Sequence, residues 1–186
     1  MKSRRLLAII FCSFLTLSTS LSGQEVQPNG TRDSCREFVR EFYVWYLAKT
    51  SKYQGRGSDL ALKFRPYLFS SELARQIRED SEAQDKAGSD LVSLDGDPFI
   101  GADGYGERYI VEKITIENEK CLAEVHAVWG RKEDDKPDVM PILVLKKGKW
   151  IFVDFYFPGP SSPNGWSLLE YLKELREEQK KTVRKR

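Results

Sequence analysis

Four strand-length apolar segments in the second half of this chain constrain its fold more than any other feature. Short turns rich in Asn, Asp, Lys and Gly separate the segments, which span residues 109–117, 121–129, 139–146 and 150–157. Strands joined by such short connections pair as antiparallel neighbours, because a parallel pair needs a crossover of about a dozen residues or more. The pattern therefore predicts an antiparallel meander.

The last of these segments is apolar on both faces, and Asp154 alone interrupts it. Strict alternation places Trp150, Phe152 and Tyr156 on one face and Ile151, Val153, Phe155 and Phe157 on the other. A strand of this kind is covered on both sides or curls around a cavity. We therefore expect a central strand of a curved sheet.

Helix signals precede and follow the meander. Capping boxes, in which a Ser is followed three residues later by a Glu, open at Ser34 and Ser167. Further helices are expected over residues 58–64 and 72–86. Together these elements predict an α+β domain, with N-terminal helices packed on a curved antiparallel sheet and a C-terminal helix.

The first 22 residues have the three parts of a cleaved secretory signal. Basic residues precede a mostly apolar run over residues 6–17, and the small residues Ser20 and Ser22 precede the expected cut. An uncleaved anchor is the weaker alternative, because a membrane span needs about 20 apolar residues. Bulky residues before Cys12 disfavour a lipoprotein. We expect export to the periplasm or the medium, and no membrane span after cleavage.

The mature chain has the length of one domain. We expect a flexible lead-in over residues 23–32, a single domain over residues 33–178 and a basic tail over residues 179–186. Cleavage would remove three basic residues, so the count of 30 Lys and Arg against 28 Asp and Glu becomes 27 against 28. This near-neutral balance gives no reason to expect nucleic acid as a partner.

Cleavage would also remove Cys12 and leave Cys35 and Cys121 as an even pair. Such a pair in an exported chain predicts a disulfide, which would close a loop of about 85 residues. A structural zinc site needs about four ligands. Two cysteines and the single His126 supply too few, so we expect no metal and no cofactor.

Three catalytic or binding motifs fail on their spacing. No Gly-x-Ser-x-Gly turn accompanies His126, so a Ser–His or Cys–His catalytic pair is disfavoured. A calcium loop that starts at Asp95 would need a ligand at Phe99 and a Glu at Gly106. The glycines at residues 101–106 have neither the dinucleotide-binding order nor a P-loop Lys. A turn held by Asp side chains is the expected structure here.

An aromatic helix, an Asp-Pro-Phe motif and a Gly-x-Trp strand entry follow one another between residues 35 and 157. The motifs are FYVWYL at 42–47, LDGDPFIGADGY at 94–105 and GKWIFVDF at 148–155. Their order resembles an uncharacterised bacterial family, domain of unknown function 3828. That family is similar to the nuclear-transport-factor-2-like, or cystatin-like, group. The resemblance implies a cone of helices over a strongly curved sheet, and no assigned activity.

Cone-shaped folds of this group often enclose a pocket under the first helix, and some use a buried Asp to move protons. Asp154 is the candidate for that role, because burial among aromatic side chains favours a protonated carboxyl. The residues expected to line the same space are Tyr43, Tyr46, Trp150 and Tyr156, with Asp97 at its mouth. In the alternative interpretation Asp154 is a core residue bonded to backbone or to an Arg, and the aromatic residues are packing.

These candidates leave two main function classes open. We expect a non-enzymatic exported domain that binds a small molecule in the cavity or a protein on the sheet face. The alternative is a small isomerase, dehydratase or hydrolase that uses Asp154 with a tyrosine. An immunity-type partner of a secreted toxin is a third hypothesis. An Asp154 hydrogen-bonded in a closed core would exclude its enzymatic role.

Overall fold

The structure is a computed structural model that describes residues 30–87, 94, 96–101, 105–130, 132–133, 136–159 and 165–184. The expected signal peptide and the lead-in up to residue 29 lie outside the described residues. Among the described residues, no helix is long and apolar enough to cross a membrane.

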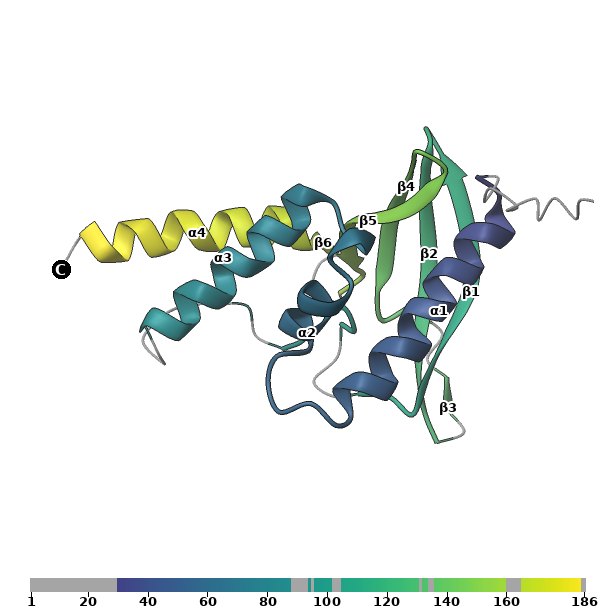
Figure 1. The fold of residues 1–186 in the computed structure, drawn as a ribbon, viewed down its shortest axis with the longest axis horizontal. Helices are drawn as coiled ribbons and strands as arrows, with labels where there is room; N and C mark the ends of the chain where they lie inside the picture. Colours follow the sequence, from purple (N-terminus) through teal and green to yellow (C-terminus); the bar gives the residue numbers. More distant parts are fainter. Residues whose placement is uncertain are drawn as a thin grey trace, which may run out of the picture.

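Helices come first, strands follow, and one helix closes the chain (Figure 1). The helices are α1 (Arg32–Thr50), α2 (Gly57–Phe64), the 3-10 helix η1 (Pro66–Leu68), α3 (Ser71–Ala87) and α4 (Leu168–Arg184). The strands are β1 (Arg108–Glu117), β2 (Lys120–Trp129), β3 (Lys132–Glu133), β4 (Met140–Lys146), β5 (Lys149–Phe157) and β6 (Trp166–Ser167). The predicted order of elements is confirmed, while the two-residue strands β3 and β6 were not predicted.

The strands form one antiparallel sheet in the order β1-β2-β4-β5-β6, with β3 paired to β2. The two hairpin turns, Asn118–Glu119 and Lys147–Gly148, both have positive φ angles. This geometry matches the twist of the strands on either side. A register shift between Val111 and Ile114 marks a bulge in β1, and bulges bend a sheet. The predicted α+β fold with a curved sheet is confirmed.

Strand β5 contains a second irregularity, which changes the faces predicted for its side chains. Pairing with β4 passes from Phe152 directly to Asp154, so Val153 is an extra residue. The prediction that Phe155 lies opposite Phe152 was wrong, because the extra residue returns Phe155 to the same face. The strand therefore buries four side chains together, Trp150, Phe152, Phe155 and Phe157.

Helix α1 begins earlier than the sequence pattern predicted. Thr31 Oγ1 accepts a hydrogen bond from the backbone N–H of Ser34, and Ser34 Oγ accepts one from Thr31 N–H, each at 3.2 Å. Thr31 is therefore the cap and Ser34 the third helical residue, while Glu37 pairs with Arg40. The prediction of Ser34 as the cap was wrong because Thr31 and Ser34 form an earlier pair with the same spacing.

Helix α1 crosses β1 and β2, and Phe42 at its centre fixes it there (Figure 1). The ring centroid of Phe42 lies 5.9 Å from that of Phe69, 5.8 Å from that of Phe99 and 4.8 Å from that of Phe152. Each aromatic pair adds about 0.5–1.5 kcal/mol beyond the area that it buries. The cluster therefore joins α1, the chain after η1, the turn at Phe99 and β5.

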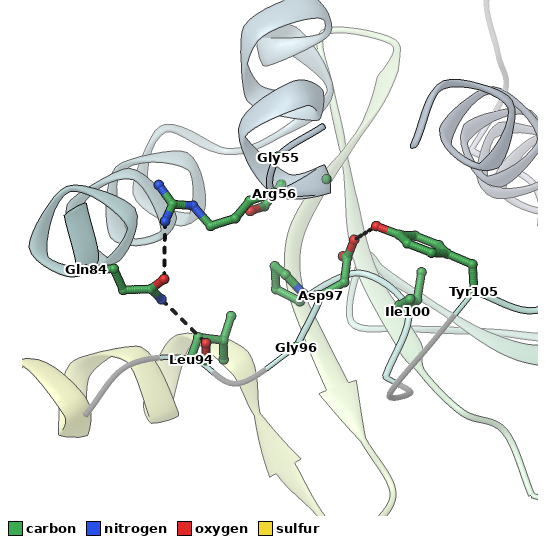
Figure 2. Close-up of a pocket in the computed structure, with 11 residues that line it drawn as sticks. Gly55, Arg56, Gln84, Leu94, Gly96, Asp97, Ile100 and Tyr105 are labelled. Atoms are coloured by element: carbon green, nitrogen blue, oxygen red, sulfur yellow. Dashed lines mark hydrogen bonds between the residues drawn. The ribbon is translucent and has the colours of Figure 1, made fainter. Parts of the chain in front are cut away.

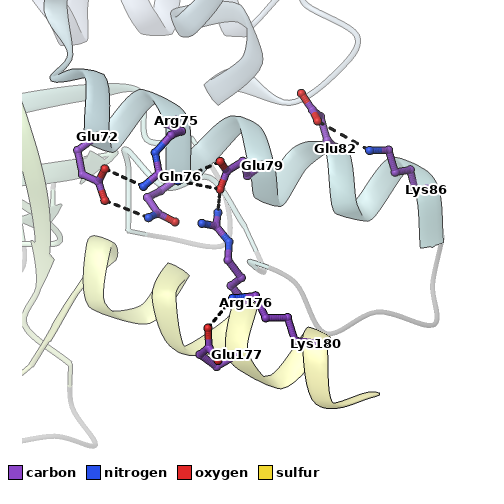
Figure 3. Close-up of polar contacts among 9 residues, drawn as sticks. All are labelled: Glu72, Arg75, Gln76, Glu79, Glu82, Lys86, Arg176, Glu177 and Lys180. Atoms are coloured by element: carbon purple, nitrogen blue, oxygen red, sulfur yellow. Dashed lines mark hydrogen bonds and ion pairs between the residues drawn. The ribbon is translucent and has the colours of Figure 1, made fainter. Parts of the chain in front are cut away.

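Helices α3 and α4 lie side by side and extend beyond the sheet (Figure 1). Arg176 on α4 reaches across to Glu79 on α3, which also accepts hydrogen bonds from Arg75 (Figure 3). Partly exposed ion pairs contribute only about 0–1 kcal/mol each. Most of the stabilisation therefore comes from the buried side chains of the two helices, Leu73, Ala74, Ile77, Leu168, Leu172 and Leu175.

Cys35 on α1 and Cys121 on β2 form a disulfide, with their Sγ atoms 1.92 Å apart and both residues fully buried. The bond connects residues separated by 86 positions, so it ties the start of the helix to the sheet. The predicted pairing is confirmed. In the chain-entropy description, closing a loop of this length stabilises a fold by about 4 kcal/mol.

Replacing Cys121 with Ser is expected to lower the free energy of unfolding by about 2–4 kcal/mol, because the unfolded chain regains the entropy that the bond removes. Urea unfolding measures the loss, and electrophoresis without reductant should no longer show a faster-moving form. Cys35→Ser is the matched control and should give the same loss. Wild-type mobility that reductant leaves unchanged would show that the bond does not form in solution.

Candidate functional site

The structure brings together only two of the residues predicted to share a pocket. Tyr46 on α1 donates a hydrogen bond to Asp97 Oδ2 at 2.5 Å. Tyr43 lies in the core instead, where its hydroxyl donates to the carbonyl of Phe99 at 2.7 Å. Trp150 and Tyr156 do not line the pocket beside Asp97, contrary to the prediction. The extra residue at Val153 places Tyr156 on the opposite face from Trp150 and Phe152.

Trp150 and Tyr156 have separate surroundings. The indole N–H of Trp150 donates to Ser34 Oγ at 3.0 Å, beside a second, mostly apolar groove of about 370 Å³ between α1 and η1. Tyr156 pairs with Ser167 where β5 meets β6. A Cβ atom added to Gly165 would lie 2.2 Å from the hydroxyl of Tyr156, so this tyrosine packs closely against the chain that enters α4.

Asp97 is held by hydrogen bonds from three donors. Tyr46 and Tyr105 both donate to Oδ2, at 2.5 and 2.9 Å, and the backbone N–H of Phe99 donates to Oδ1 at 3.0 Å. The last bond is the Asp-held turn that the sequence predicted. Asp95 and Asp103, from the same predicted turn region, lie outside the described residues.

The first residue of α2 packs directly against this pair. A Cβ atom added to Gly57 would lie 2.2 Å from Tyr46 Oη and 2.5 Å from Asp97 Oδ2, so only glycine fits there. The preceding residue, Arg56, is the N-cap, and its side chain makes no capping hydrogen bond. The N-terminus of α2 therefore lies beside the carboxylate of Asp97 with backbone N–H groups that no side chain caps.

A pocket of about 350 Å³ opens beside Asp97, between the start of α2, the end of α3 and the turn at residues 96–101. Figure 2 shows Arg56 and Gln84 on one side of it and Asp97 and Tyr105 on the other. Its lining residues are Gly55, Arg56, Gly57, Ser58, Gln84, Leu94, Gly96, Asp97, Pro98, Ile100 and Tyr105. This volume suits a small molecule.

Arg56 is fully engaged within the protein. Its guanidinium pairs with Asp59 at 3.0 Å and with Asp85 at 2.8 Å, and it also donates to Gln84 Oε1 at 3.3 Å. Ser81 in turn donates to Asp59 at 2.9 Å. These contacts fix Arg56 at the wall of the pocket and balance its charge with two carboxylates.

Burial controls the protonation of the site. It raises the pKa of the Asp97 carboxyl above its ordinary value, although the bonds from the three donors act in the opposite direction. Burial and the nearby carboxylate also raise the pKa of the Tyr46 and Tyr105 hydroxyls. Both tyrosines therefore stay protonated at neutral pH and act as donors.

Asp154, the predicted acid–base residue, caps α4 instead. Its Oδ1 accepts from the N–H groups of Phe155 and Leu169, at 2.8 and 3.0 Å, and its Oδ2 accepts from the hydroxyl of Ser167 at 2.6 Å. It does not line the pocket at Asp97. This placement agrees with the alternative interpretation, in which Asp154 is bonded to backbone. Asp154 is hydrogen-bonded as that interpretation expects, but it is partly buried rather than enclosed in the core.

Several pocket residues were missed. Gly55 and Gly57 belong to no motif in the sequence, and Ser58 is only the first residue of a predicted helix. Tyr105 falls in the glycine-containing segment whose motif failed on its spacing. Their common role depends on the meeting of segments separated by about 50 residues, which no local pattern encodes.

Within the described ranges, no group of three or more His, Cys, Asp or Glu side chains is arranged to hold a metal ion. His126 is buried on β2, with its Nε2 atom 3.5 Å from Glu112. No protein-family model, curated protein or solved structure matches this chain.

Asp97→Asn and Asp154→Asn form a matched pair, because each changes a carboxylate that accepts from three donors. Asp97→Asn should leave the free energy of unfolding at neutral pH equal to or above that of the wild type, since it removes a charge that burial disfavours. Asp154→Asn should lower it by about 1–2 kcal/mol, since it weakens a helix cap.

The free energy of unfolding of Asp97→Asn should exceed that of the wild type by more as the pH rises. Because folding raises the pKa of Asp97, the folded wild type binds more protons than the unfolded chain between the two pKa values. Its stability therefore falls as the pH rises from the pKa in the unfolded chain towards the pKa in the folded protein. Urea unfolding of both proteins at several pH values measures the difference. A loss of about 2 kcal/mol in Asp97→Asn at neutral pH would contradict this account and make Asp97 a structural residue.

Proposed function

We propose that this protein is an exported domain that binds a small polar molecule in the pocket beside Asp97, without catalysing a reaction. The observation that carries the proposal is the position of Asp97. A partly buried carboxylate, whose burial disfavours its charge, lies at the wall of a pocket of about 350 Å³. Such a group is costly to keep in a fold unless a ligand uses it.

The polar groups around the pocket support a binding role. The hydroxyl of Tyr105 and the carboxylate of Asp97 lie on one wall, and Gln84 and Arg56 lie on the other (Figure 2). Each is held by hydrogen bonds to its own neighbours. Polar groups fixed in advance lose little conformational entropy when a ligand binds.

Export is also part of the proposal, since the N-terminal sequence has the pattern of a cleaved signal. The disulfide between Cys35 and Cys121 supports an oxidising compartment. We further propose membership of the family domain of unknown function 3828, in the nuclear-transport-factor-2-like group. The helices on a curved antiparallel sheet support this assignment.

Acid–base catalysis at Asp97 is the second candidate function. The raised pKa of Asp97 and the two tyrosine hydroxyls beside it favour this candidate. However, three donors already occupy the carboxylate, so only part of its accepting capacity is left for a substrate. Binding without chemistry therefore has the better support.

The first experiment is native mass spectrometry of the protein purified from its own host. We expect a bound small molecule in the wild type, and its loss from Asp97→Asn because the pocket then lacks its carboxylate. Chemical alteration of the released molecule on incubation with fresh wild type would favour the catalytic candidate instead.

Asp154→Asn is the control for this experiment, because it changes an equally bonded carboxylate outside the pocket. It should retain the molecule. Equal loss from both variants would mean that retention depends on stability rather than on the pocket. A wild type that carries no molecule and has no effect on added small molecules would contradict the proposed function.

A further inference from the structure

We infer that the pocket beside Asp97 binds a small molecule through a protonated primary amine, whose ammonium group pairs with the Asp97 carboxylate. The inference rests on the proposed function and deepens it, since it names the chemical class of the ligand. It follows from the charges around the pocket and from which of them already have partners.

Asp97 has no cationic partner in the part of the chain that the structure describes. Its contacts are two tyrosine hydroxyls and one backbone N–H, which stabilise a carboxylate but do not neutralise it. A buried carboxylate normally pairs with a cation or coordinates one. Since Asp97 faces a pocket, the missing positive charge fits a ligand.

Arg56 does not supply that charge, although it lines the same pocket. Its guanidinium is held by Asp59 and Asp85, and Figure 2 shows it directed towards Gln84, away from Asp97. Arg56 and its two partners together carry a net negative charge. The guanidinium of Arg56 is therefore already neutralised by carboxylates behind the pocket wall, and Asp97 is the carboxylate that lines the pocket itself.

Besides Arg56, the N-terminus of α2 also favours an anion. A helix end carries about half a unit of positive charge, which falls off within one turn. Gly57 packs against Asp97 Oδ2, so that half charge is already directed at the carboxylate. It offsets part of the charge of Asp97 and leaves the remainder for the ligand.

The rest of the lining suits the donors and the carbon skeleton of an amine. Tyr105 is 42% exposed and presents its ring at the edge of the pocket, where a cation gains from the electrons of the ring. Ser58 is 4% exposed and lines the pocket, so its hydroxyl oxygen lies where it can accept a second N–H. Leu94, Pro98 and Ile100 provide an apolar wall.

Three probes of the same shape and different charge test the inference: cyclohexylamine, cyclohexanol and cyclohexanecarboxylate. Each is titrated at neutral pH into the disulfide-bonded protein, and amide shifts of residues 55–58, 96, 97, 99 and 100 in ¹⁵N-labelled protein report on the pocket. We expect cyclohexylamine to bind about tenfold or more tightly than cyclohexanol, and the carboxylate to bind most weakly.

Asp97→Asn should abolish the preference for the amine, so that cyclohexylamine and cyclohexanol bind equally. Asp85→Asn is the matched control. It removes a carboxylate from the same region, but Asp85 is 67% exposed and does not line the pocket, so its charge is screened. The preference should persist in that variant. The wild-type comparison decides the inference by itself if Asp97→Asn does not fold.

The possible failures are distinguishable. Cyclohexanol or the carboxylate binding as tightly as the amine at the same amides would overturn the amine inference and leave a binding pocket. A preference for the amine that survives Asp97→Asn in a folded protein would overturn it too. No shift with any probe, together with no molecule retained from the host, would overturn the proposed function as well.

Discussion

The aromatic cluster around Phe42 is the interaction on which the other features of the structure depend. It joins α1 to the sheet through Phe152, and to the turn that carries Asp97 through Phe99. One turn of helix separates Phe42 from Tyr46, and their rings stack with centroids 5.3 Å apart. The packing that holds α1 in place therefore also sets the position of the Tyr46 hydroxyl against Asp97. The disulfide at Cys35 fixes the other end of the same helix.

Asp97 and Asp154 show how similar bonding leads to different roles. Each accepts from three donors, one of them a backbone N–H close by in the chain. The bonds of Asp154 hold the start of α4 on β5, so its charge stabilises a helix terminus. The bonds of Asp97 leave it at the wall of a pocket, where burial opposes its charge. The carboxylate chosen from the sequence was thus the structural one.

Most of the fold could be predicted from the sequence, because short turns and apolar runs are local signals. The boundaries of β1, β2, β4 and β5 lie within one residue of the segments predicted for them. The faces of β5 could not be predicted, since one extra residue at Val153 reverses the alternation after it. That reversal also explains the misassigned site: it turns Phe155 inward and leaves Asp154 directed at α4.

The pair of Tyr46 and Asp97 at the candidate site could be predicted, and the other residues that line the pocket could not. Tyr46 and Asp97 stood out as polar groups among aromatic residues. Ser58, Gln84 and Tyr105 carried no signal of their own, since each lines the pocket only because α2, α3 and the turn at 96–101 meet there. Gly57 precedes the helix predicted from residue 58, so the sequence did not mark the close approach to Asp97 that a glycine permits there.

In the proposed binding mode, the burial of Asp97 links the stability of this protein to its ligand. The aromatic cluster and the disulfide hold α1 in place, so the site does not relax to expose the carboxylate more fully to water. The free-energy cost of the buried charge therefore persists while the pocket is empty. A ligand that neutralises Asp97 removes this cost in addition to making its own contacts, whereas an uncharged ligand of equal shape makes the contacts alone. In that proposal the pocket would therefore discriminate between ligands chiefly by charge, with shape complementarity to its apolar wall as the weaker criterion.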